Sequence, residues 1–402
     1  MMIRDFKDFK EYVARHRHVR RCIVRADLNL PSDVEDLTKV HAIKDTVMDV
    51  LAMDLRVVLI SHYKRPSAED ANDPKYSLRN VVNNVSSVVG EEVNFMGGLL
   101  FDIDPSSITA KVTMLENLRF YDGETKNDRW FAEELAKFGD IYINDAFSVS
   151  HRRHASVCAI TEHLPSFAGH SMKREIDGIS AVTDHIKRPF TAIIGGSKIS
   201  SKMEVLKQLS QTADTLVITG AMANTFLASK DVDMKCSLVE RDQLEIAAKI
   251  LREAQANIML PEDVVAAESI NHAGSSYDVT QIPDGYSCFD IGPRAIAKIT
   301  GIIEKSRTLL WNGAVGAFEF SNFCEGSATV AKVVSHATRH NAIVSVIGGG
   351  ETVASIGIYK DDITFISTAG GAFLEFVAGY KLPGVEALRK DEASQATRKS
   401  GT

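Results

Sequence analysis

The sequence contains few cysteines, and they form no recognisable pair. Five cysteines are scattered through 402 residues without a CxxC spacing: Cys22, Cys158, Cys236, Cys288 and Cys324. This pattern argues against a disulfide framework and against a cysteine-based zinc site. It favours reduced thiols, so we expect a cytoplasmic protein.

The sequence also lacks long apolar runs and an excess of positive charge. No apolar stretch approaches the length of a transmembrane helix, and the opening segment MMIRDFKDFKEYVARHRHVRR is too charged for a secretory signal. The formal net charge is -7 at pH 7, which argues against general nucleic-acid binding. We therefore expect no membrane and no nucleic acid as a partner, and any anion site must be a local cluster of bases.

The sequence does contain short, β-branched apolar runs that alternate with amphipathic helical patterns. The expected strands are Cys22–Ala26, Arg56–Ile60, Lys111–Leu115, Asp140–Ile143, Thr191–Ile194, Thr215–Thr219, Ile258–Leu260, Thr308–Trp311, Ile343–Ile347 and Thr364–Ile366. The expected helices are Val40–Met53, Arg129–Lys137, Ser171–His185, Gln243–Ala256, Gly292–Lys305 and Gly326–Arg339. Strand runs in which apolar and polar residues scarcely alternate are typical of parallel sheets that helices cover on both faces.

These patterns predict an α/β protein with two doubly wound, Rossmann-like parallel-sheet domains. The chain is too long for one ordinary core. The boundary is expected near Arg188–Pro189, where a helical pattern ends and a strand pattern begins, so the first domain would span residues 1–187. The final segment KDEASQATRKSGT is polar and is expected to fray into solvent.

Polar and charged side chains follow several predicted strands of the first half. Ligands of open parallel sheets bind beyond the carboxyl ends of the strands, so these side chains are expected to meet at one edge. A single arginine is more often a solvated surface charge, but repetition at the same position favours a site. Arginine forks suit phosphate and carboxylate oxygens, which predicts a small, multiply charged anion. The set comprises Asp27, Asn29, His62, Arg65, Arg119, His151 and Arg152.

Glycine-rich turns carry the corresponding residues of the second half. The segment TAIIGGSKISSK places Gly196 before Lys198 and Lys202. Two lysines at i, i+4 spacing on one helix face repel each other unless an anion lies between them, although a solvated helix face is the alternative. The segment WNGAVGAFEF adds Asn312 and the isolated acid Glu319.

A second glycine-rich turn points to a nucleotide. The segment VIGGGETVAS contains Gly348, Gly349, Gly350, Glu351 and Thr352. Bare backbone N–H groups can approach a phosphate there, and the carboxylate and hydroxyl can hold a magnesium ion on it. In ISTAGGAFLEF, Gly370 and Gly371 begin another helical run that could face a phosphoryl group. Neither GxGxxG nor GxxxxGK[ST] occurs, so the dinucleotide fingerprint and the Walker P-loop are both absent.

Seven segments together resemble the phosphoglycerate kinase family. They are RADLNLP, LISHYKRP, LENLRFYDGETKND with FAEELAKFGDIYINDAFSVSHRRHAS, IIGGSKISSKMEVL, WNGAVGAFEF, VIGGGETVA and STAGGAFLEFVAGYKLPGVEAL. They occur in the family's order from about Val24 to Leu388. The resemblance implies two Rossmann-like domains separated by a cleft that closes by hinge bending. It divides the chain into a phosphoglycerate-binding domain (1–187), a nucleotide-binding domain (188–370) and a C-terminal segment (371–402) that returns to the first domain.

The resemblance also implies residue roles. Phosphoglycerate would be held by Asp27, Leu28, Asn29, Lys39, His62, Tyr63, Lys64, Arg65, Arg119 and Arg152. ADP or ATP would be held by Gly196, Lys198, Lys202, Asn312, Glu319, Gly348, Gly349, Gly350, Glu351 and Thr352. The catalytic set would be Lys39, Lys198, Gly370 and Gly371, with Glu351 on a magnesium ion and Glu319 on the ribose.

The implied reaction is the reversible, magnesium-dependent transfer of the acyl phosphate of 1,3-bisphosphoglycerate to ADP, which gives ATP and 3-phosphoglycerate. In the reverse direction the nucleophile is a carboxylate that is already ionised near neutral pH, so no general base is needed. The remaining work is to bring two anions together and to neutralise charge on the transferred group. The family leans towards monomers, so a monomer is expected.

Several residues depart from the family pattern. Lys39 stands where the family has an arginine, with His41 or Lys44 as possible compensating bases. The other departures are Ser201 for an acid, Glu351 for an aspartate, Ala369 for a glycine and Ala314 for a proline. These changes keep a degenerate relative that binds nucleotide without transfer as an alternative. A nicotinamide-dependent dehydrogenase is a second alternative, but it predicts the GxGxxG fingerprint, which is absent.

Overall fold

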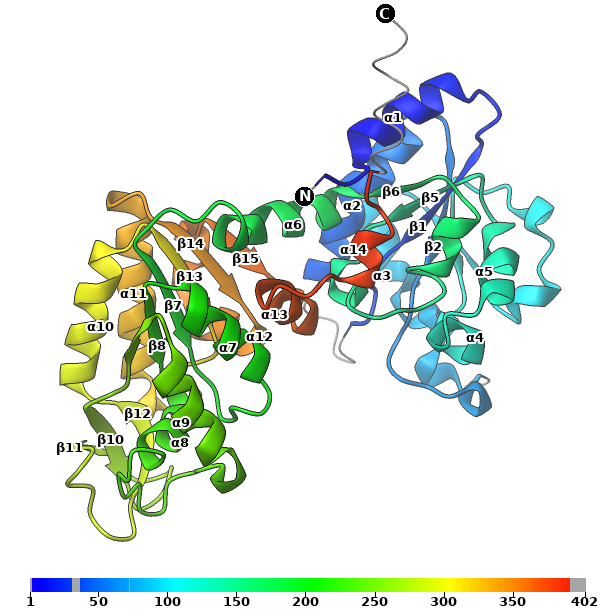
Figure 1. Ribbon diagram of the computed structural model, residues 1–402. Coiled ribbons are helices and arrows are strands. Elements are labelled where there is room, and N and C mark those ends of the chain that lie inside the picture. Colours follow the sequence, from blue (N-terminus) through cyan, green and yellow to red (C-terminus); the bar gives the residue numbers. More distant parts are fainter. Residues whose placement is uncertain (1, 31–36, 72, 391–402) are drawn as a thin grey trace, which may run out of the picture. The chain divides into compact units, whose positions relative to one another are not determined.

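The computed structural model describes residues 2–30, 37–71 and 73–390. The expected frayed tail, from residue 391 on, lies outside the described residues. The chain forms two compact units, which are shown in Figure 1. Unit 1 contains the residues up to Ile176 together with those from Lys381 onward, and unit 2 is Asp177–Tyr380.

Unit 1 is built on a six-stranded parallel sheet with the strand order β3-β4-β2-β1-β5-β6. Its strands are β1 (Arg21–Arg25), β2 (Arg56–Ile60), β3 (Val93–Met96), β4 (Val112–Leu115), β5 (Ile141–Asn144) and β6 (Ser166–Ala168). Its helices are α1 (Phe6–Arg15), α2 (Thr38–Leu51), α3 (Val82–Val89), α4 (Asp122–Thr125), α5 (Arg129–Ala136) and α14 (Pro383–Glu386). The helix α6 (His170–Thr183) begins in unit 1 and ends in unit 2.

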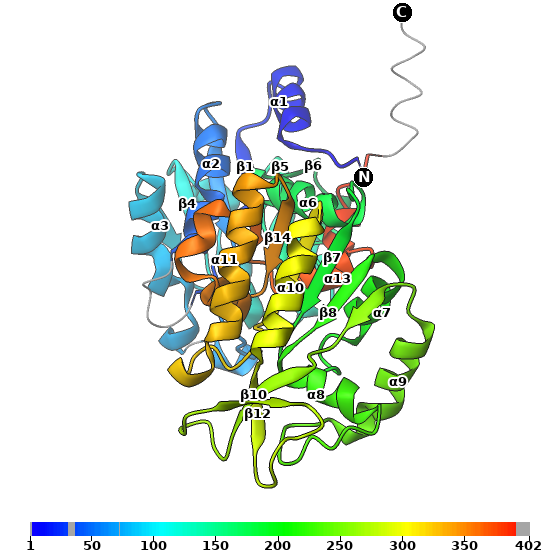
Figure 2. The same cartoon turned by 90° about the vertical axis from the view of Figure 1, so that its left-hand side faces the viewer.

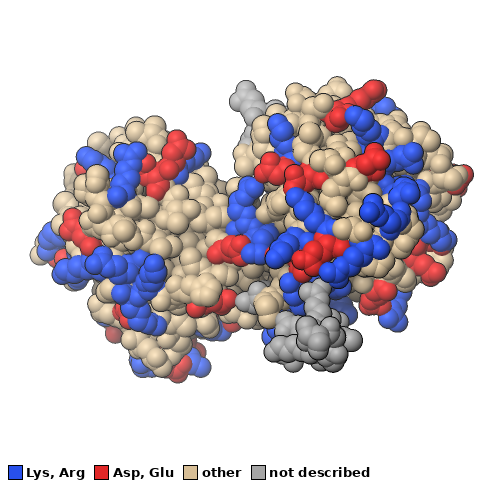
Figure 3. Space-filling model, turned by 90° about the horizontal axis from the view of Figure 1, so that it is seen from above, with Lys and Arg blue, Asp and Glu red and all other residues tan. Residues whose placement is uncertain are grey.

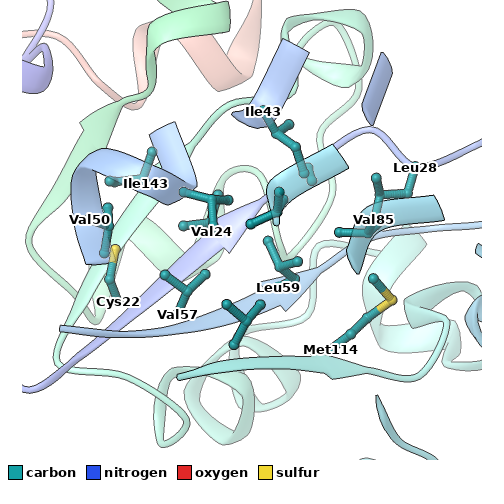
Figure 4. Close-up of a cluster of buried hydrophobic side chains, with 14 of the residues drawn as sticks. Cys22, Val24, Leu28, Ile43, Val50, Val57, Leu59, Val85, Met114 and Ile143 are labelled. Atoms are coloured by element: carbon teal, nitrogen blue, oxygen red, sulfur yellow. The ribbon is translucent and has the colours of Figure 1, made fainter. Parts of the chain in front are cut away.

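Both faces of this sheet are covered, which explains why its strand runs do not alternate. Figure 4 shows Val24 and Leu59 of the sheet packed with Ile43 of α2 and Val85 of α3. The opposite face forms a second core, in which Ile23 packs among side chains of α5. Each strand residue therefore meets apolar neighbours whichever way it points.

The C-terminal segment packs on unit 1. The Arg4 amide donates to the Leu388 carbonyl oxygen at 2.8 Å, and the Gly384 amide donates to the Ser150 carbonyl oxygen at 2.9 Å. A side chain at Gly384 would lie 2.6 Å from Val157, so glycine permits this close approach. The return expected from residue 371 begins instead at Lys381, because α13 (Gly371–Val377) belongs to unit 2.

Unit 2 contains a second six-stranded parallel sheet, in the order β15-β14-β13-β7-β8-β9, and a small antiparallel sheet, β11-β10-β12. The parallel strands are β7 (Phe190–Ile194), β8 (Thr215–Ile218), β9 (Asn257–Met259), β13 (Thr308–Asn312), β14 (Val344–Gly348) and β15 (Phe365–Ser367). The antiparallel strands are β10 (Asp263–Ala267), β11 (Ser275–Asp278) and β12 (Ser287–Ile291).

Helices cover the large sheet of unit 2 on both faces. They are α7 (Met203–Thr212), α8 (Gly220–Ala228), α9 (Leu244–Glu253), α10 (Pro293–Lys305), α11 (Glu325–His340), α12 (Gly350–Ser355) and α13. Figure 2 shows α10 and α11 side by side over one face, where their apolar residues pack on Leu309 and Trp311. The helices α7, α8 and α9 lie on the other side of the sheet (Figure 1).

The predicted fold class is confirmed, and each expected strand and helix is present within a few residues of its predicted bounds. The strands β3, β6 and β10 to β12 were not predicted. The two units change at Asp177 rather than at the expected residue 188, because the connecting helix α6 is shared between them. The boundary of a unit depends on which neighbours a helix contacts, and the hydrophobic periodicity of the sequence contains no information about those contacts.

Charged side chains of both signs are distributed over the surface. Figure 3 shows lysine and arginine side chains intermixed with aspartate and glutamate on one face. Among the residues described, no helix combines the length and the apolar character needed to cross a membrane.

Candidate active site

The first group of predicted residues surrounds Asp27, which follows β1 in unit 1. The Lys39 Nζ atom lies 2.9 Å from Asp27 Oδ2 and donates to the Asn29 carbonyl oxygen at 3.0 Å. The Ser148 hydroxyl donates to Asp27 Oδ2 at 2.5 Å, and the Lys64 amide donates to Asn29 Oδ1 at 2.7 Å. Burial opposes ionisation of Asp27, but the charges of Lys39 and His62 and the hydrogen bonds from Lys39 and Ser148 together outweigh it, and the pKa falls to about 2. The structure therefore joins three of the predicted strand-end loops.

Asn117 holds two further substrate segments in place. Its Oδ1 atom accepts hydrogen bonds from the amides of Tyr63 and Arg119, each at 3.0 Å. Its Nδ2 atom donates to the carbonyl oxygens of Tyr63 and Tyr76, at 2.7 and 2.8 Å. The sequence prediction missed Asn117, although it lies in LENLRF, because a buried amide has no pattern of its own in a sequence.

Three arginines act on the buried His62. The Arg25 Nη2 atom lies 3.3 Å from His62 Nδ1. Burial, followed by the charge of Arg25, lowers the pKa of His62 well below its usual value, and Arg119 and Arg152 act in the same direction. Burial also lowers the pKa of Arg119, with contributions from Arg152, Arg25 and Arg65. The unit therefore concentrates positive charge at one place, as an anion site requires.

Arg119 lacks internal partners for part of its guanidinium group. Its Nε and Nη2 atoms are buried and have no hydrogen-bond partner among the described residues. Buried donors are almost always satisfied, so a guanidinium with free donors next to other arginines is suited to bind an anion. Arg152, which donates from Nε to His151 Nε2 at 3.3 Å, belongs to the same cluster.

Arg25 is a member of this cluster that the sequence prediction missed. It is fully buried, and its Nε atom donates to Ser156 Oγ at 2.9 Å. The Ser156 hydroxyl in turn donates to Glu124 Oε1 at 2.7 Å. The chain from Glu124 to Arg25 fixes the guanidinium behind His62. The only indication of this role in the sequence is that Arg25 is the first residue of the motif RADLNLP.

The pH dependence of stability should reflect His154, whose Nδ1 atom lies 3.8 Å from Glu124 Oε1. Burial and the charge of Arg119 lower the pKa of His154 to about 3. The unfolded chain then binds a proton that the folded chain does not, so this contribution to stability is present above pH 6.5 and is lost as the pH falls towards 3. We expect His154→Gln to flatten the loss of unfolding free energy between pH 6.5 and 4 in urea titrations. The exposed His163→Gln is the control, and an equal slope in all three proteins would contradict the prediction.

In unit 2, Lys202 is fixed by backbone carbonyl groups. Its Nζ atom donates to the carbonyl oxygen of Gly195 at 2.8 Å and lies 3.4 Å from that of Asn312. Burial lowers its pKa to about 8, against the opposing charge of Glu351. Lys202 precedes α7, so the expected helical i, i+4 arrangement with Lys198 is wrong. Lys198 lies in the turn after β7 and is exposed.

The glycine turns after β13 and β14 are tied directly to each other. Asn312 Nδ2 donates to the Gly348 carbonyl oxygen at 2.6 Å, and the Gly313 amide donates to Thr352 Oγ1 at 2.6 Å. The Thr352 hydroxyl donates to the Gly348 carbonyl oxygen at 3.0 Å. That hydroxyl is thus engaged inside the protein, in contrast to the expectation that it helps to hold magnesium. Gly349 has φ +96°, and a side chain there would lie 2.8 Å from Asn312 Nδ2.

A cavity of about 220 Å³ opens beside these turns. The predicted residues Gly196, Glu319 and Glu351 line it, and both carboxylates belong to exposed residues. Side chains that the sequence prediction missed form much of its wall; they include Leu227, Pro261, Val264, Cys288, Phe289, Asp290 and Val315. A largely apolar wall with a few polar groups is typical of a small-molecule site.

Some predicted residues serve the protein framework. The side chains of Leu28 and Tyr63 are buried in the core of unit 1, which leaves only their backbones for a ligand. Gly370 has φ +55° and immediately precedes α13, which begins at Gly371 as expected. The described residues contain no group of three or more His, Cys, Asp or Glu side chains arranged for a metal ion. Glu351 remains an exposed carboxylate beside the cavity, which suits a magnesium ion that is held mainly by nucleotide phosphates.

Comparisons with known proteins identify the family of the chain. A family model described as phosphoglycerate kinase matches residues 16–380. The phosphoglycerate kinase of Sinorhizobium fredii (strain NBRC 101917 / NGR234) is 39% identical over 93% of this chain and 96% of its own length. That of Rhizobium meliloti (strain 1021) is 40% identical over 92% and 96%. The solved phosphoglycerate kinase of Coxiella burnetii is 29% identical with a TM-score of 0.84, and it covers 92% of this chain and 96% of its own. On these grounds, the chain belongs to the phosphoglycerate kinase family.

Proposed function

We propose that the protein is a phosphoglycerate kinase, which transfers the acyl phosphate of 1,3-bisphosphoglycerate to ADP and, in reverse, phosphorylates 3-phosphoglycerate with ATP. The observation that carries the proposal is the arginine cluster of unit 1, in which Arg119 keeps buried guanidinium donors that have no partner within the described part of the chain. Membership of the family supplies the reaction. The alternative of a degenerate relative rests only on the substitutions in the motifs.

The phosphoglycerate would bind in unit 1. We propose that Arg65, Arg119 and Arg152 bind its phosphate and carboxylate groups. A planar guanidinium group can donate two parallel hydrogen bonds to two oxygen atoms of such a group. His62 would remain neutral, since its pKa is lowered, and would donate a hydrogen bond rather than a charge. Asp27 would orient Lys39 and the loop around Asn29.

The nucleotide would bind in unit 2. The cavity wall formed by Leu227, Val264 and Phe289 would accept the base, and Glu319 would accept hydrogen bonds from the ribose. The backbone N–H groups of 349–352 would contact the phosphates. Glu351 would hold a magnesium ion, which supplies positive charge to the phosphate oxygens when it is bound.

Phosphoryl transfer requires little from the protein beyond positioning and charge. The attacking carboxylate is already ionised, so no side chain has to remove a proton. Lys198, Lys39 and the turn at Gly370 and Gly371 would surround the phosphoryl group and balance its charge. The acceptor residues belong to unit 1 and the nucleotide residues to unit 2, so transfer requires that the two bound ligands come together and that water is excluded.

One coupled assay tests the function against both alternatives. The protein is mixed with 3-phosphoglycerate, ATP and magnesium, and formation of 1,3-bisphosphoglycerate is followed through a coupling dehydrogenase. Turnover supports the proposal, while ADP binding without turnover would identify the degenerate relative. Activity of the protein alone with a nicotinamide cofactor would identify a dehydrogenase. Size-exclusion chromatography tests the proposed monomer, and cell fractionation tests the proposed cytoplasmic location.

The family departure at Lys39 gives a further prediction. Lys39 Nζ is already engaged with Asp27 and Asn29, so a single ammonium group has to serve these contacts and the phosphoryl group together. Arginine offers a planar fork with more donors. We expect Lys39→Arg to raise kcat by about threefold in the coupled assay, with Lys7→Arg, at an exposed position of α1, as control. A clear fall would show that the site is organised around lysine.

A further inference from the structure

Asp290 is a buried acid in unit 2 that has no role in the reaction described above. It lies near the end of β12, is only 6% exposed, and lines the nucleotide cavity. Asp290 lies outside all of the sequence motifs and segments that resemble the family. A carboxylate buried beside a ligand cavity needs a structural or functional reason, because burial of a charge is costly.

The carboxylate of Asp290 connects β12 to the start of α11. Its Oδ1 atom accepts a hydrogen bond from the Ile291 amide at 2.9 Å, and its Oδ2 atom accepts one from the Gly326 amide at 2.8 Å. Gly326 lies in the first turn of α11, where backbone N–H groups have no partner within the helix and where the helix dipole favours negative charge. Burial, which outweighs both hydrogen bonds, raises the pKa of Asp290 to about 7.

The cavity loop of residues 314–319 packs against this carboxylate. A side chain at Gly316 would lie 2.2 Å from Asp290 Oδ1, so the loop backbone lies directly on the acid. The Ala317 amide donates to the Phe289 carbonyl oxygen at 2.8 Å, and the Val315 amide donates to Ser327 Oγ at 3.1 Å. The loop is therefore held by β12 on one side and by the first turn of α11 on the other.

The same loop also forms hydrogen bonds with two glycines that line the cavity. The Gly220 amide donates to the Val315 carbonyl oxygen at 2.8 Å, and the Gly196 amide donates to the Ala314 carbonyl oxygen at 3.2 Å. Glu319 lies at the end of this loop. A shift of the loop would therefore move the ribose acceptor and two glycine turns together.

We propose that Asp290 is a positioning residue for the nucleotide, because its carboxylate fixes the loop of residues 314–319 between β12 and the first turn of α11. This inference rests on the proposed function of the cavity. Asp290 itself acts through the loop backbone. Its loss should therefore weaken nucleotide binding while the affinity for phosphoglycerate stays unchanged.

Asp263 provides a matched control in the same unit. It is also buried, and its two carboxylate oxygens accept hydrogen bonds from the amides of Ala295 and Arg294 at the start of α10, at 2.8 and 2.9 Å. It does not line the cavity. Each of the variants Asp290→Asn and Asp263→Asn changes a buried carboxylate that accepts a backbone amide at a helix start, but only Asp290 lies against the cavity loop. Asp263 differs in that Arg294 Nε also lies 3.6 Å from its Oδ2 atom.

The test is to measure the Kd for ADP with magnesium by calorimetry, KM for each substrate, kcat and Tm for both variants. The asparagine side chain has a single acceptor oxygen, so it can accept a hydrogen bond from only one of the two backbone amides. We therefore expect Asp290→Asn to raise both the Kd for ADP and the KM for the nucleotide about tenfold. KM for 3-phosphoglycerate should not change. Asp263→Asn should lower Tm and leave the Kd for ADP as in the wild type.

Each outcome decides the inference. Equal ADP affinity in Asp290→Asn and wild type overturns it, as does equal loss of affinity in both variants, which would indicate general destabilisation. If Asp290→Asn does not fold, Ser327→Ala removes the second support of the loop, and unchanged ADP binding there also overturns it. A wild-type protein that binds ADP but does not turn over refutes the proposed function alone. One that binds no ADP refutes both.

Discussion

Replacement of Lys198 by alanine is expected to lower kcat by about a thousandfold while ADP with magnesium still binds. The Lys198 side chain makes no hydrogen bond or ion pair with any described residue, and it extends from the exposed turn after β7. The neighbouring Lys202, in contrast, is engaged by the carbonyl oxygens of Gly195 and Asn312. Lys198 is therefore the lysine that remains free to contact the phosphoryl group during transfer.

The two functions of the lysine turn can be separated by measurement. Single-turnover kinetics give the rate of transfer, and calorimetry gives the affinity for ADP. Lys207→Ala removes an exposed lysine that pairs with Glu204 at 3.0 Å on the following helix, and it should behave as the wild type. Wild-type turnover in Lys198→Ala would disprove the assigned role. Partial recovery in Lys198→Arg would show that positive charge alone supplies part of the effect.

Replacement of Arg119 by alanine is expected to raise KM for 3-phosphoglycerate about a hundredfold, because a charge-assisted, paired contact to the ligand is lost. The KM for ATP should remain unchanged, since the nucleotide residues belong to the other unit. Stability should not fall. Two of its guanidinium nitrogens are buried beside other arginines and have no partner among the residues that the structure describes, so the group destabilises the folded protein when no substrate is bound.

This combination of effects distinguishes a ligand site from a structural arginine. A structural arginine would lower Tm on removal, whereas Arg119→Ala should leave Tm unchanged or raise it. Arg129→Ala serves as the control, because Arg129 is exposed and pairs with Glu162 in the same unit. Its kinetics should match the wild type. A lower Tm in Arg119→Ala with an unchanged KM would contradict the assignment.

The sequence alone was sufficient for the fold class and for most of the secondary structure. Runs such as Arg56–Ile60 and Thr308–Trp311 predict strands because their apolar residues are local and continuous, and burial on both faces leaves a direct pattern. The glycine turns around Gly349 and Gly370 could also be located, since a positive φ restricts the residue type.

The sequence located the candidate site only in part. Strand-end charges such as Arg119 and Glu319 follow predictable strands, so their place at a sheet edge could be inferred. Thr352 and Lys202 could be assigned to segments next to the glycine turns, but their contacts with Gly348 and Gly195 could not be foreseen. Hydrogen bonds of this kind join segments that are distant in the chain.

What only the tertiary structure decided is the support behind each site. Arg25 became part of the anion cluster because β1 and β2 lie side by side and bring it to His62. Asp290 came to lie against Gly316 and Gly326 because the small antiparallel sheet, which has no strong periodic signal, packs beside α11. Sequence patterns record how each residue relates to its near neighbours in the chain. The environment of a buried charge is set by partners far away in the chain, and only folding brings these together.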